Sequence, residues 1–331
     1  MLRLFQSNHP LTLLVLLVYG ILLRLPLFLH PVVVAYPADA SLLGPAEAHW
    51  MFWLQESNPI WLYVVAYVLS FLQGVFLSEL LNRFKLLPEQ NYYAAAVYIT
   101  ISSIFTEWQT ILMASLIMFL VLWVLMQLVM KYRHDKAYGA VFDIGLAIGL
   151  SFLLQVNMLA MIIFILFAFV ILRAFVVREW LNLFVGIVVP SFLAFTWYFY
   201  DNRLGQFVSR IAGHFMINRR VAFPLELTDL LQYSWMIFGG LYVFVVLQAR
   251  LNNRVVLVRK MMWIFFHLVW MSLLAYFLDP DRTRGGVYLL ILPISFFFSY
   301  YLCIEKRLWL RDIFFLSFVA LVVLNYLPIN L

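Results

Sequence analysis

Long runs of apolar residues, rather than an alternation of apolar and polar positions, dominate the sequence. The clearest run extends from Thr110 to Met130 and contains no charged residue. Its length meets the roughly 20 residues that a helix needs to cross a hydrocarbon core of about 30 Å. Alternating segments of about 10 residues, typical of membrane barrels, are absent. Because lipid forces backbone polar groups to pair within the chain, the pattern predicts a bundle of transmembrane helices.

Eleven runs of this kind are expected to be helical spans, with ten to twelve as the range of the count. No linker or low-complexity tract separates them, so the sequence predicts an all-α polytopic bundle forming a single integral membrane domain over 1–331. The expected spans cover 11–29, 59–80, 92–106, 110–130, 137–155, 158–177, 183–200, 230–248, 261–278, 285–304 and 312–328.

Composition excludes a soluble globular domain. Apolar residues make up 66% of the chain and charged residues 11%, against about 45–50% and about 25% in ordinary soluble domains. The single cysteine, Cys303, excludes an intramolecular disulfide. The first apolar run is followed by Leu29, His30 and Pro31 rather than by small residues, so we expect an uncleaved first helix instead of a signal peptide.

The distribution of Lys and Arg predicts the orientation, because cytoplasmic segments carry an excess of both. With the N-terminus inside and eleven spans, 15 of the 22 Lys and Arg residues fall in inner segments and six in outer segments, while Arg24 lies within the first span. This bias favours an inside N-terminus and an outside C-terminus.

Two expected outer loops are long enough to carry structure. The loop 30–58 contains acidic residues and no Lys or Arg, and the loop 201–229 is basic. An aromatic cluster in the first loop predicts an interfacial helix, with its rings at the depth of the lipid headgroups; it consists of Trp50, Met51, Trp53 and Leu54. An acidic and a basic loop on one face can form a single site.

All six basic residues of the outer segments are arginines, which bind phosphate and carboxylate groups through a planar fork. They are Arg203, Arg210, Arg219, Arg220, Arg282 and Arg284. The simpler explanation is that long loops escape the charge rule. In the turn FLDPDRTRGGVYLLILP, two of these arginines could bind a phosphate, or they could neutralise the adjacent aspartates.

Charged residues inside or beside spans are informative because each is costly there. Arg24 is expected to extend toward the outer interface, or else to pair with an acid such as Asp39 or with a lipid phosphate. Asp143 is expected to pair with a nearby Lys or Arg. Glu107, in the outer turn SSIFTEWQT, is interpreted either as a simple turn carboxylate or as a wall of an outer cavity that receives substrate.

Signatures of cofactor or metal chemistry are missing from the sequence. There is no phosphate-binding glycine-rich loop, no HExxH, no cysteine cluster and no serine nucleophile elbow. The six histidines are scattered, with no two at helical spacing. We therefore expect no cofactor, no metal and no nucleic-acid partner.

Several stretches together resemble the GT-C superfamily of membrane glycosyltransferases, which use polyprenyl-phosphate sugars as donors. In chain order they are LLRLPLFLHP, LLNRFKLLPEQNYYAAAVY, SSIFTEWQT, GAVFDIGLAIGLSFLLQ and RTRGGVYLLILP. The resemblance covers about Leu11 to Glu305 and implies a GT-C-like fold. The chain also resembles an uncharacterised family of multi-pass inner-membrane proteins from Bacteroidota, which implies a bacterial inner membrane and no particular function.

The resemblance implies a glycosyltransferase that acts at the outer face on a polyprenyl-phosphate-linked donor. Asp39 would be the catalytic base, and Arg282 and Arg284, with Arg219 or Arg220, would hold the departing lipid phosphate. The chain departs from the family in having a lone Asp39 in YPADAS, where the family has an adjacent acidic pair. A lysine that often follows the glycine-rich helix is also replaced by QVN.

Two other functions stay open at this point, so enzymatic activity is not decided by the sequence. One is a non-catalytic GT-C-like subunit of an envelope-biogenesis or protein-export complex, with membrane protein partners; the missing second acid favours it. The third is a transporter, although inverted repeats are not visible and intramembrane acids are few. Membrane lipids are partners in all three.

Overall fold

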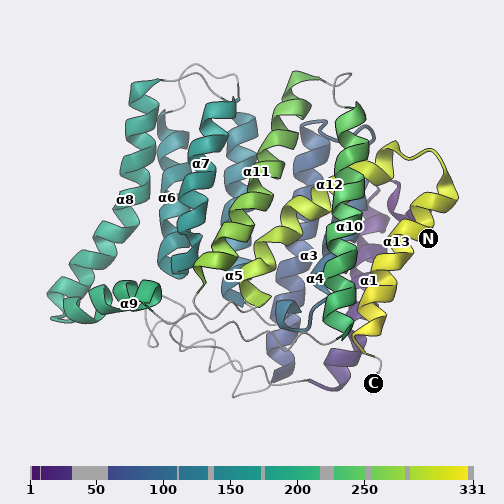
Figure 1. The fold of residues 1–331 in the computed structure, drawn as a ribbon, viewed down its shortest axis with the longest axis horizontal. Helices are drawn as coiled ribbons and strands as arrows, with labels where there is room; N and C mark the ends of the chain where they lie inside the picture. The colour runs from purple at the N-terminus through teal and green to yellow at the C-terminus, as the bar shows by residue number, and fades with distance from the viewer. Residues whose placement is uncertain are drawn as a thin grey trace.

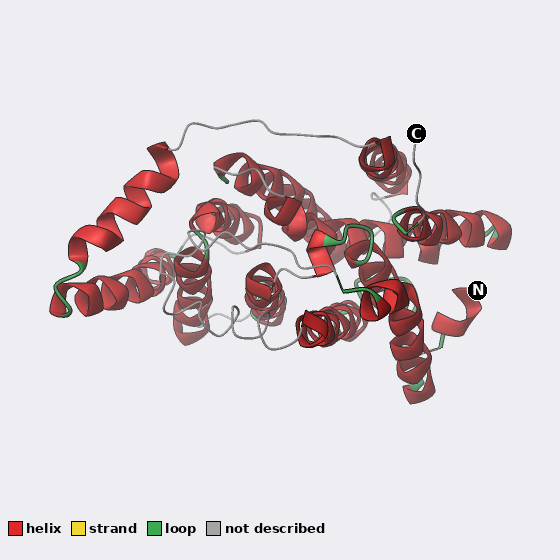
Figure 2. Cartoon of the chain, turned by 90° about the horizontal axis from the view of Figure 1, so that it is seen from below, coloured by secondary structure: helices red, strands yellow, loops and turns green. Residues whose placement is uncertain are grey.

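A computed structural model describes residues 2–7, 9–31, 59–109, 112–132, 138–172, 176–216, 227–250, 255–279 and 284–326 of the chain. Within these residues every regular element is a helix and no strand occurs (Figure 2). The prediction of an all-α protein is confirmed.

The helices follow one another through short connections. The α-helices are α1 (Pro10–Leu29), α3 (Pro59–Arg83), α4 (Tyr93–Ser102), α5 (Leu112–Met130), α6 (Tyr138–Leu154), α7 (Leu159–Leu172), α8 (Val177–Tyr200), α9 (Leu204–Met216), α10 (Leu227–Arg250), α11 (Val256–Leu278), α12 (Ile291–Ile304) and α13 (Leu308–Leu324). Short 3₁₀-helices are η1 (Leu2–Phe5), η3 (Glu107–Gln109), η4 (Val156–Met158) and η6 (Arg284–Leu290).

Seven helical segments are long and apolar enough to cross a membrane, which identifies an integral membrane protein; α12 reaches this length together with the end of η6. Each of the eleven expected ranges contains a helix, but α4, α6 and the η4–α7 segment are shorter apolar helices. A helix rises about 1.5 Å per residue, so the ten residues of α4 cannot span about 30 Å alone. The count of eleven spans therefore stays a prediction.

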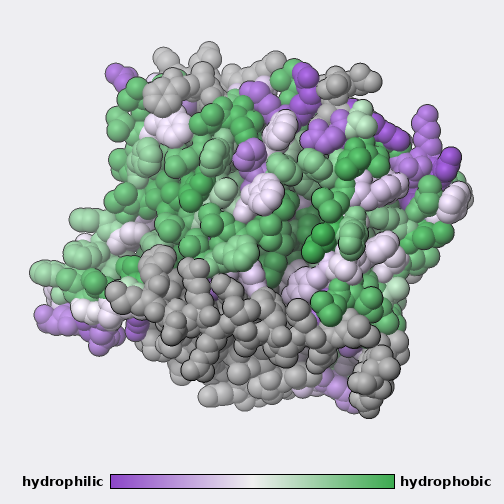
Figure 3. All heavy atoms as spheres, in the orientation of Figure 1, coloured by the Kyte–Doolittle hydropathy of each residue, from purple (hydrophilic) through white to green (hydrophobic). Residues whose placement is uncertain are grey.

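The bundle has two ends, which Figure 1 shows as an upper and a lower end. The C-terminal ends of α1 and α8 and the N-terminal ends of α3 and α10 lie at the lower end, where α9 runs across the bundle. These ends flank the two long loops, so the structure brings the boundaries of both loops to one face. Figure 3 shows hydrophobic residues across the middle of the bundle and hydrophilic residues gathered at its upper end and at the corner between α8 and α9.

The centre of the bundle is built around α4, because small residues let neighbouring helices approach it closely. Every residue of its sequence YAAAVYITIS is buried. It packs mainly against α3 and α12, and α12 is itself almost entirely buried. A short helix buried on all sides needs hydrophobic residues on every face.

Helices α6 and α8 approach each other at the distance of backbone contact. A Cβ atom added to Gly145 would collide with the carbonyl oxygen of Leu183, and one added to Gly186 would collide with that of Phe142. Small residues at such positions permit close helix packing in membranes. This contact fixes α8, which carries α9 at its lower end (Figure 1).

Candidate functional site

Arg24 is buried in the lower half of the bundle, five residues before the end of α1. Only 2% of its surface is exposed, so the expectation that it extends to the outer interface is wrong. Its Nε donates a hydrogen bond to Ser103 Oγ at 2.9 Å, and its Nη2 donates to Ser102 Oγ at 2.8 Å. The guanidinium therefore points into the bundle, toward the end of α4.

The two serines are arranged to accept these bonds. Ser102 and Ser103 end the apolar sequence of α4, and each hydroxyl donates its own hydrogen to the carbonyl oxygen of Ile99, at 3.0 and 2.8 Å. Serine hydroxyls commonly bond back to the preceding helical turn. Because the hydroxyl hydrogens are used there, the lone pairs of both oxygens face Arg24.

Tyr67 of α3 covers another side of the guanidinium. The centre of its ring lies 5.3 Å from Cζ of Arg24, within the range of a cation–π interaction. Its hydroxyl donates to the carbonyl oxygen of Leu17 at 2.6 Å. Gly20 makes this approach possible, since a Cβ atom there would lie 2.7 Å from the edge and the hydroxyl of the Tyr67 ring.

One donor and one acceptor at this site have no hydrogen-bond partner. Nη1 of Arg24 is buried and unpaired, and so is Oε1 of Gln109. The amide nitrogen of Gln109 donates to the carbonyl oxygen of Ser103 at 3.0 Å and, at 3.4 Å, to the hydroxyl of Tyr326. The cluster thus offers a positively charged donor and a neutral acceptor to a further group.

A polar network whose hydrogen bonds are made adjoins this cluster. Gln73 of α3 donates to the carbonyl oxygen of Ser115 at 2.6 Å and accepts from the hydroxyl of Tyr98 at 2.7 Å. The hydroxyl of Tyr288 lies 3.0 Å from Ser115 Oγ. These bonds join α3, α4, α5 and η6, and hold rigid the helices that surround Arg24.

The charge of Arg24 has no counter-ion among the residues that the structure describes, since its contacts are serine hydroxyls and the Tyr67 ring. A buried charge without an opposite charge is strongly destabilising. An ionisable residue inside a membrane span is, by default, a functional-site hypothesis. The arrangement favours an anionic group as the missing partner.

Of the expected site residues, Glu107 is the one whose whole environment is described. It lies half-buried in η3, two residues from Gln109. Arg284 begins η6, at the start of the segment that carries Tyr288. The other expected site residues lie outside the described residues: Asp39, Arg219, Arg220 and Arg282.

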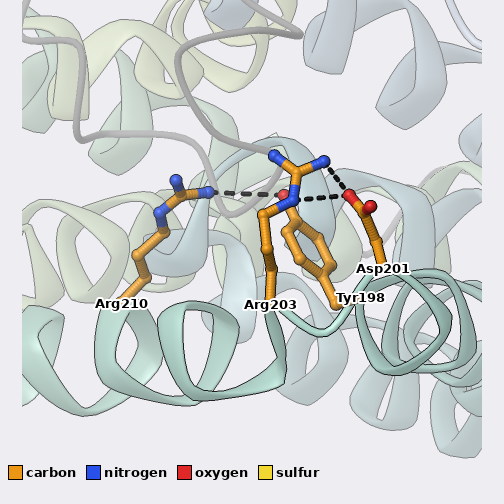
Figure 4. Close-up of polar contacts among 4 residues, drawn as sticks. All are labelled: Tyr198, Asp201, Arg203 and Arg210. Atoms are coloured by element: carbon orange, nitrogen blue, oxygen red, sulfur yellow. Dashed lines mark hydrogen bonds and ion pairs between the residues drawn. The ribbon is translucent and has the colours of Figure 1, made fainter.

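Two further outer arginines are engaged at the corner between α8 and α9 (Figure 4). Arg203 forms an ion pair with Asp201, and Arg210 donates to the hydroxyl of Tyr198 at 3.3 Å. Asn202 takes a left-handed conformation with φ of 55°, which asparagine tolerates better than most residues. These contacts set the direction of α9.

Asp143 corrects another expectation. It is exposed near the start of α6 and, within the described part of the chain, it forms no ion pair with Lys or Arg. An exposed carboxylate keeps its hydration and needs no partner.

Sequence reasoning missed Ser102, Ser103 and Gln109, and gave Arg24 the wrong direction. A signal was present, because the hydroxyl-rich stretch TISS ends an otherwise apolar helix. Among the described residues, no three His, Cys, Asp or Glu side chains come close enough to hold a metal ion.

Comparison with known proteins adds no relative: no family model, no curated protein and no solved structure matches the chain.

Proposed function

We propose that this chain is a GT-C-like membrane glycosyltransferase, which takes a sugar from a polyprenyl-phosphate-linked donor at the outer face of the bacterial inner membrane. The observation that supports the proposal is the buried guanidinium of Arg24, with Nη1 unpaired. A lipid-linked phosphate is an anion that reaches membrane depth with its own apolar chain. Arg24 would bind it through charge-assisted hydrogen bonds.

The reaction needs a base, and Asp39 is assigned that role. Asp39 removes the proton of an acceptor hydroxyl as the acceptor oxygen attacks the anomeric carbon of the donor sugar. The bond between that carbon and the phosphate oxygen breaks, and polyprenyl phosphate leaves with the negative charge. Fixed positive charge at that oxygen stabilises the transition state.

The outer loops would complete the site from above. Arg282 and Arg284, with Arg219 or Arg220, would neutralise the phosphate as it departs. Glu107 would line the path of the acceptor, beside Gln109 in η3.

Binding of a synthetic polyprenyl phosphate to the purified protein in nanodiscs tests the assignment. Arg24→Gln removes the charge but keeps an amide that can bond to the serines. It should weaken binding about tenfold or more, because a hydrogen bond to a charged group contributes about 1.5–3 kcal/mol. Arg311→Gln is the matched control, since Arg311 is also buried and also lies over a tyrosine ring, with Cζ 5.4 Å from the centre of Tyr93.

The outcome separates the proposed enzyme from the alternatives. Arg311 lies near the start of α13, at the upper end of the bundle, so Arg311→Gln should bind the lipid like the unmodified protein. Failure of the unmodified protein to bind polyprenyl phosphate would contradict the proposal. The non-catalytic subunit of an envelope complex would then be the leading function.

A further inference from the structure

The turn between α6 and α7 carries a second set of buried polar atoms. Gln155 ends the backbone bonding of α6, with its N–H donating to the carbonyl oxygen of Ser151 at 3.1 Å. Asn157 follows in η4. Gln155 is 8% exposed and Asn157 is 1% exposed.

Three side-chain atoms of this turn have no hydrogen-bond partner. They are Oε1 of Gln155 and both Oδ1 and Nδ2 of Asn157. A buried polar atom without a partner loses its hydration and gains nothing in return. Native proteins contain few such groups, and each one calls for a ligand, an ordered water or another explanation.

The turn lies at the same end of the bundle as Arg24. Leu154, the last residue of α6, packs against Leu112 and Met113 of α5. The following turn of α5 carries Ser115, which bonds to Tyr288 beside the Arg24 cluster. The first turns of α5 therefore lie between the two polar sets (Figure 1).

The corner between α8 and α9 closes the other side of the turn. Val156, between the two amides, packs in one apolar cluster with Tyr198 and Phe207. The rings of Tyr198 and Phe207 stack with their centres 5.0 Å apart. Apolar and aromatic walls around a few polar groups are typical of small-molecule sites.

The chemistry of the turn suits hydroxyl groups better than phosphate. A carboxamide offers an acceptor oxygen and a donor nitrogen without net charge, and a sugar hydroxyl both donates and accepts. We propose that Gln155 and Asn157 form a subsite for the hydroxyl groups of the donor sugar, separate from the phosphate site at Arg24. This inference rests on the proposed function and adds that the donor sugar is uncharged where it meets this turn.

Two lipids distinguish the subsite from the phosphate site: a synthetic polyprenyl phosphate, and the same lipid carrying one neutral hexose. The affinity of nanodisc-embedded protein is measured for both. The unmodified protein should bind the hexose lipid more tightly. Asn157→Leu and Gln155→Met should each reduce that preference by up to about tenfold, through lost hydrogen bonds, while leaving the affinity for bare polyprenyl phosphate unchanged.

Stability provides a second readout. Asn157→Leu removes two unpaired atoms, so its melting temperature without ligand should not fall. The control is Asn82→Leu, because Asn82 is a buried amide whose atoms bond to the backbone of Asn91 at 2.9 and 3.2 Å. Asn82→Leu should lower the melting temperature and keep the preference for the hexose lipid.

Each outcome decides the inference. A hexose preference that survives in both Asn157→Leu and Gln155→Met overturns the sugar subsite, while lipid-phosphate binding still stands. Equal binding of the two lipids by the unmodified protein has the same meaning, with an ordered water then occupying the turn. Absence of binding to either lipid contradicts the proposed function itself.

Discussion

The guanidinium of Arg24 lies 5.3 Å from the centre of the Tyr67 ring, inside the bundle and without a carboxylate bonded to it. The ring compensates part of the charge, because the electron-rich face of an aromatic ring attracts a cation. It leaves Nη1 unpaired, so the pair holds a positive charge in place while one donor stays open. A guanidinium held in this way is preorganised for an anion.

The Tyr67 side chain should contribute to stability through two separable interactions. Tyr67→Phe keeps the ring and loses the bond to the carbonyl oxygen of Leu17, so it should lower the free energy of unfolding by about 0.5–1.5 kcal/mol. Tyr67→Leu also removes the cation–π interaction, which contributes about 0.5–2 kcal/mol more. Denaturant unfolding in mixed micelles measures both, and equal stability of the two variants would show that the ring contributes nothing.

Gly20→Ala should push the Tyr67 ring away from α1. The added Cβ would lie 2.7 Å from the ring edge, and overpacking of this kind costs about 1–3 kcal/mol. Gly240→Ala is the control, since nothing lies within 4 Å of a Cβ there, and alanine favours a helix over glycine by up to about 1 kcal/mol. Unfolding of the two variants should therefore shift in opposite directions.

Gly145→Ala should separate α6 from α8, because the new Cβ meets the backbone of Leu183 rather than a movable side chain. We expect destabilisation of about 1–3 kcal/mol or more. Gly139→Ala, in the first turn of the same helix and with nothing within 4 Å, should be neutral or slightly stabilising. A loss of stability at Gly139 equal to that at Gly145 would refute the close-packing explanation.

The topology prediction can be tested with single cysteines in a Cys303→Ser background. Ser209 on α9 and Lys306 before α13 are both exposed and lie at opposite ends of the bundle. A membrane-impermeant maleimide should label Ser209→Cys in spheroplasts, and should label Lys306→Cys only after the membrane is permeabilised. The reverse pattern would place the N-terminus outside.

The helices could be predicted from the sequence because an apolar run of sufficient length has one stable conformation in lipid. Their ends were less accurate: α7 ends at Leu172, before the expected 177, and α8 begins at Val177, before the expected 183. The basic residues around 173–178 lie at the interface, where charge does not determine whether the backbone is helical.

The site could be predicted only in part, because burial depends on which helices are neighbours. Arg24 was expected to reach the interface, but α4 and Tyr67 cover its side of α1. In the outer turn, attention fell on the charged Glu107, whereas the buried bonds are made by Gln109. Neither neighbour is adjacent to Arg24 in the sequence, so no local pattern could reveal the contact.

The last prediction concerns Asp39, which lies outside the described residues and carries the catalytic part of the proposal. Asp39→Asn keeps the shape of the side chain and removes the basic oxygen. Loss of a general base costs about 10²–10⁴ in rate, so the variant should fail to complement a deletion strain although it inserts at normal abundance. Asp143→Asn is the control, because Asp143 is exposed and forms no ion pair among the described residues.

Abundance and lipid binding give the complementation result its meaning. A surface carboxylate changes stability by about 0.5 kcal/mol or less, so both variants should reach the level of the unmodified protein. Asp39→Asn should also bind polyprenyl phosphate normally, since the phosphate is assigned to Arg24 and the outer arginines. Full complementation by Asp39→Asn at normal abundance would exclude the glycosyltransferase mechanism and favour the non-catalytic subunit. Failure to complement with lipid binding intact would mean that the lost step follows donor binding, as expected of a general base.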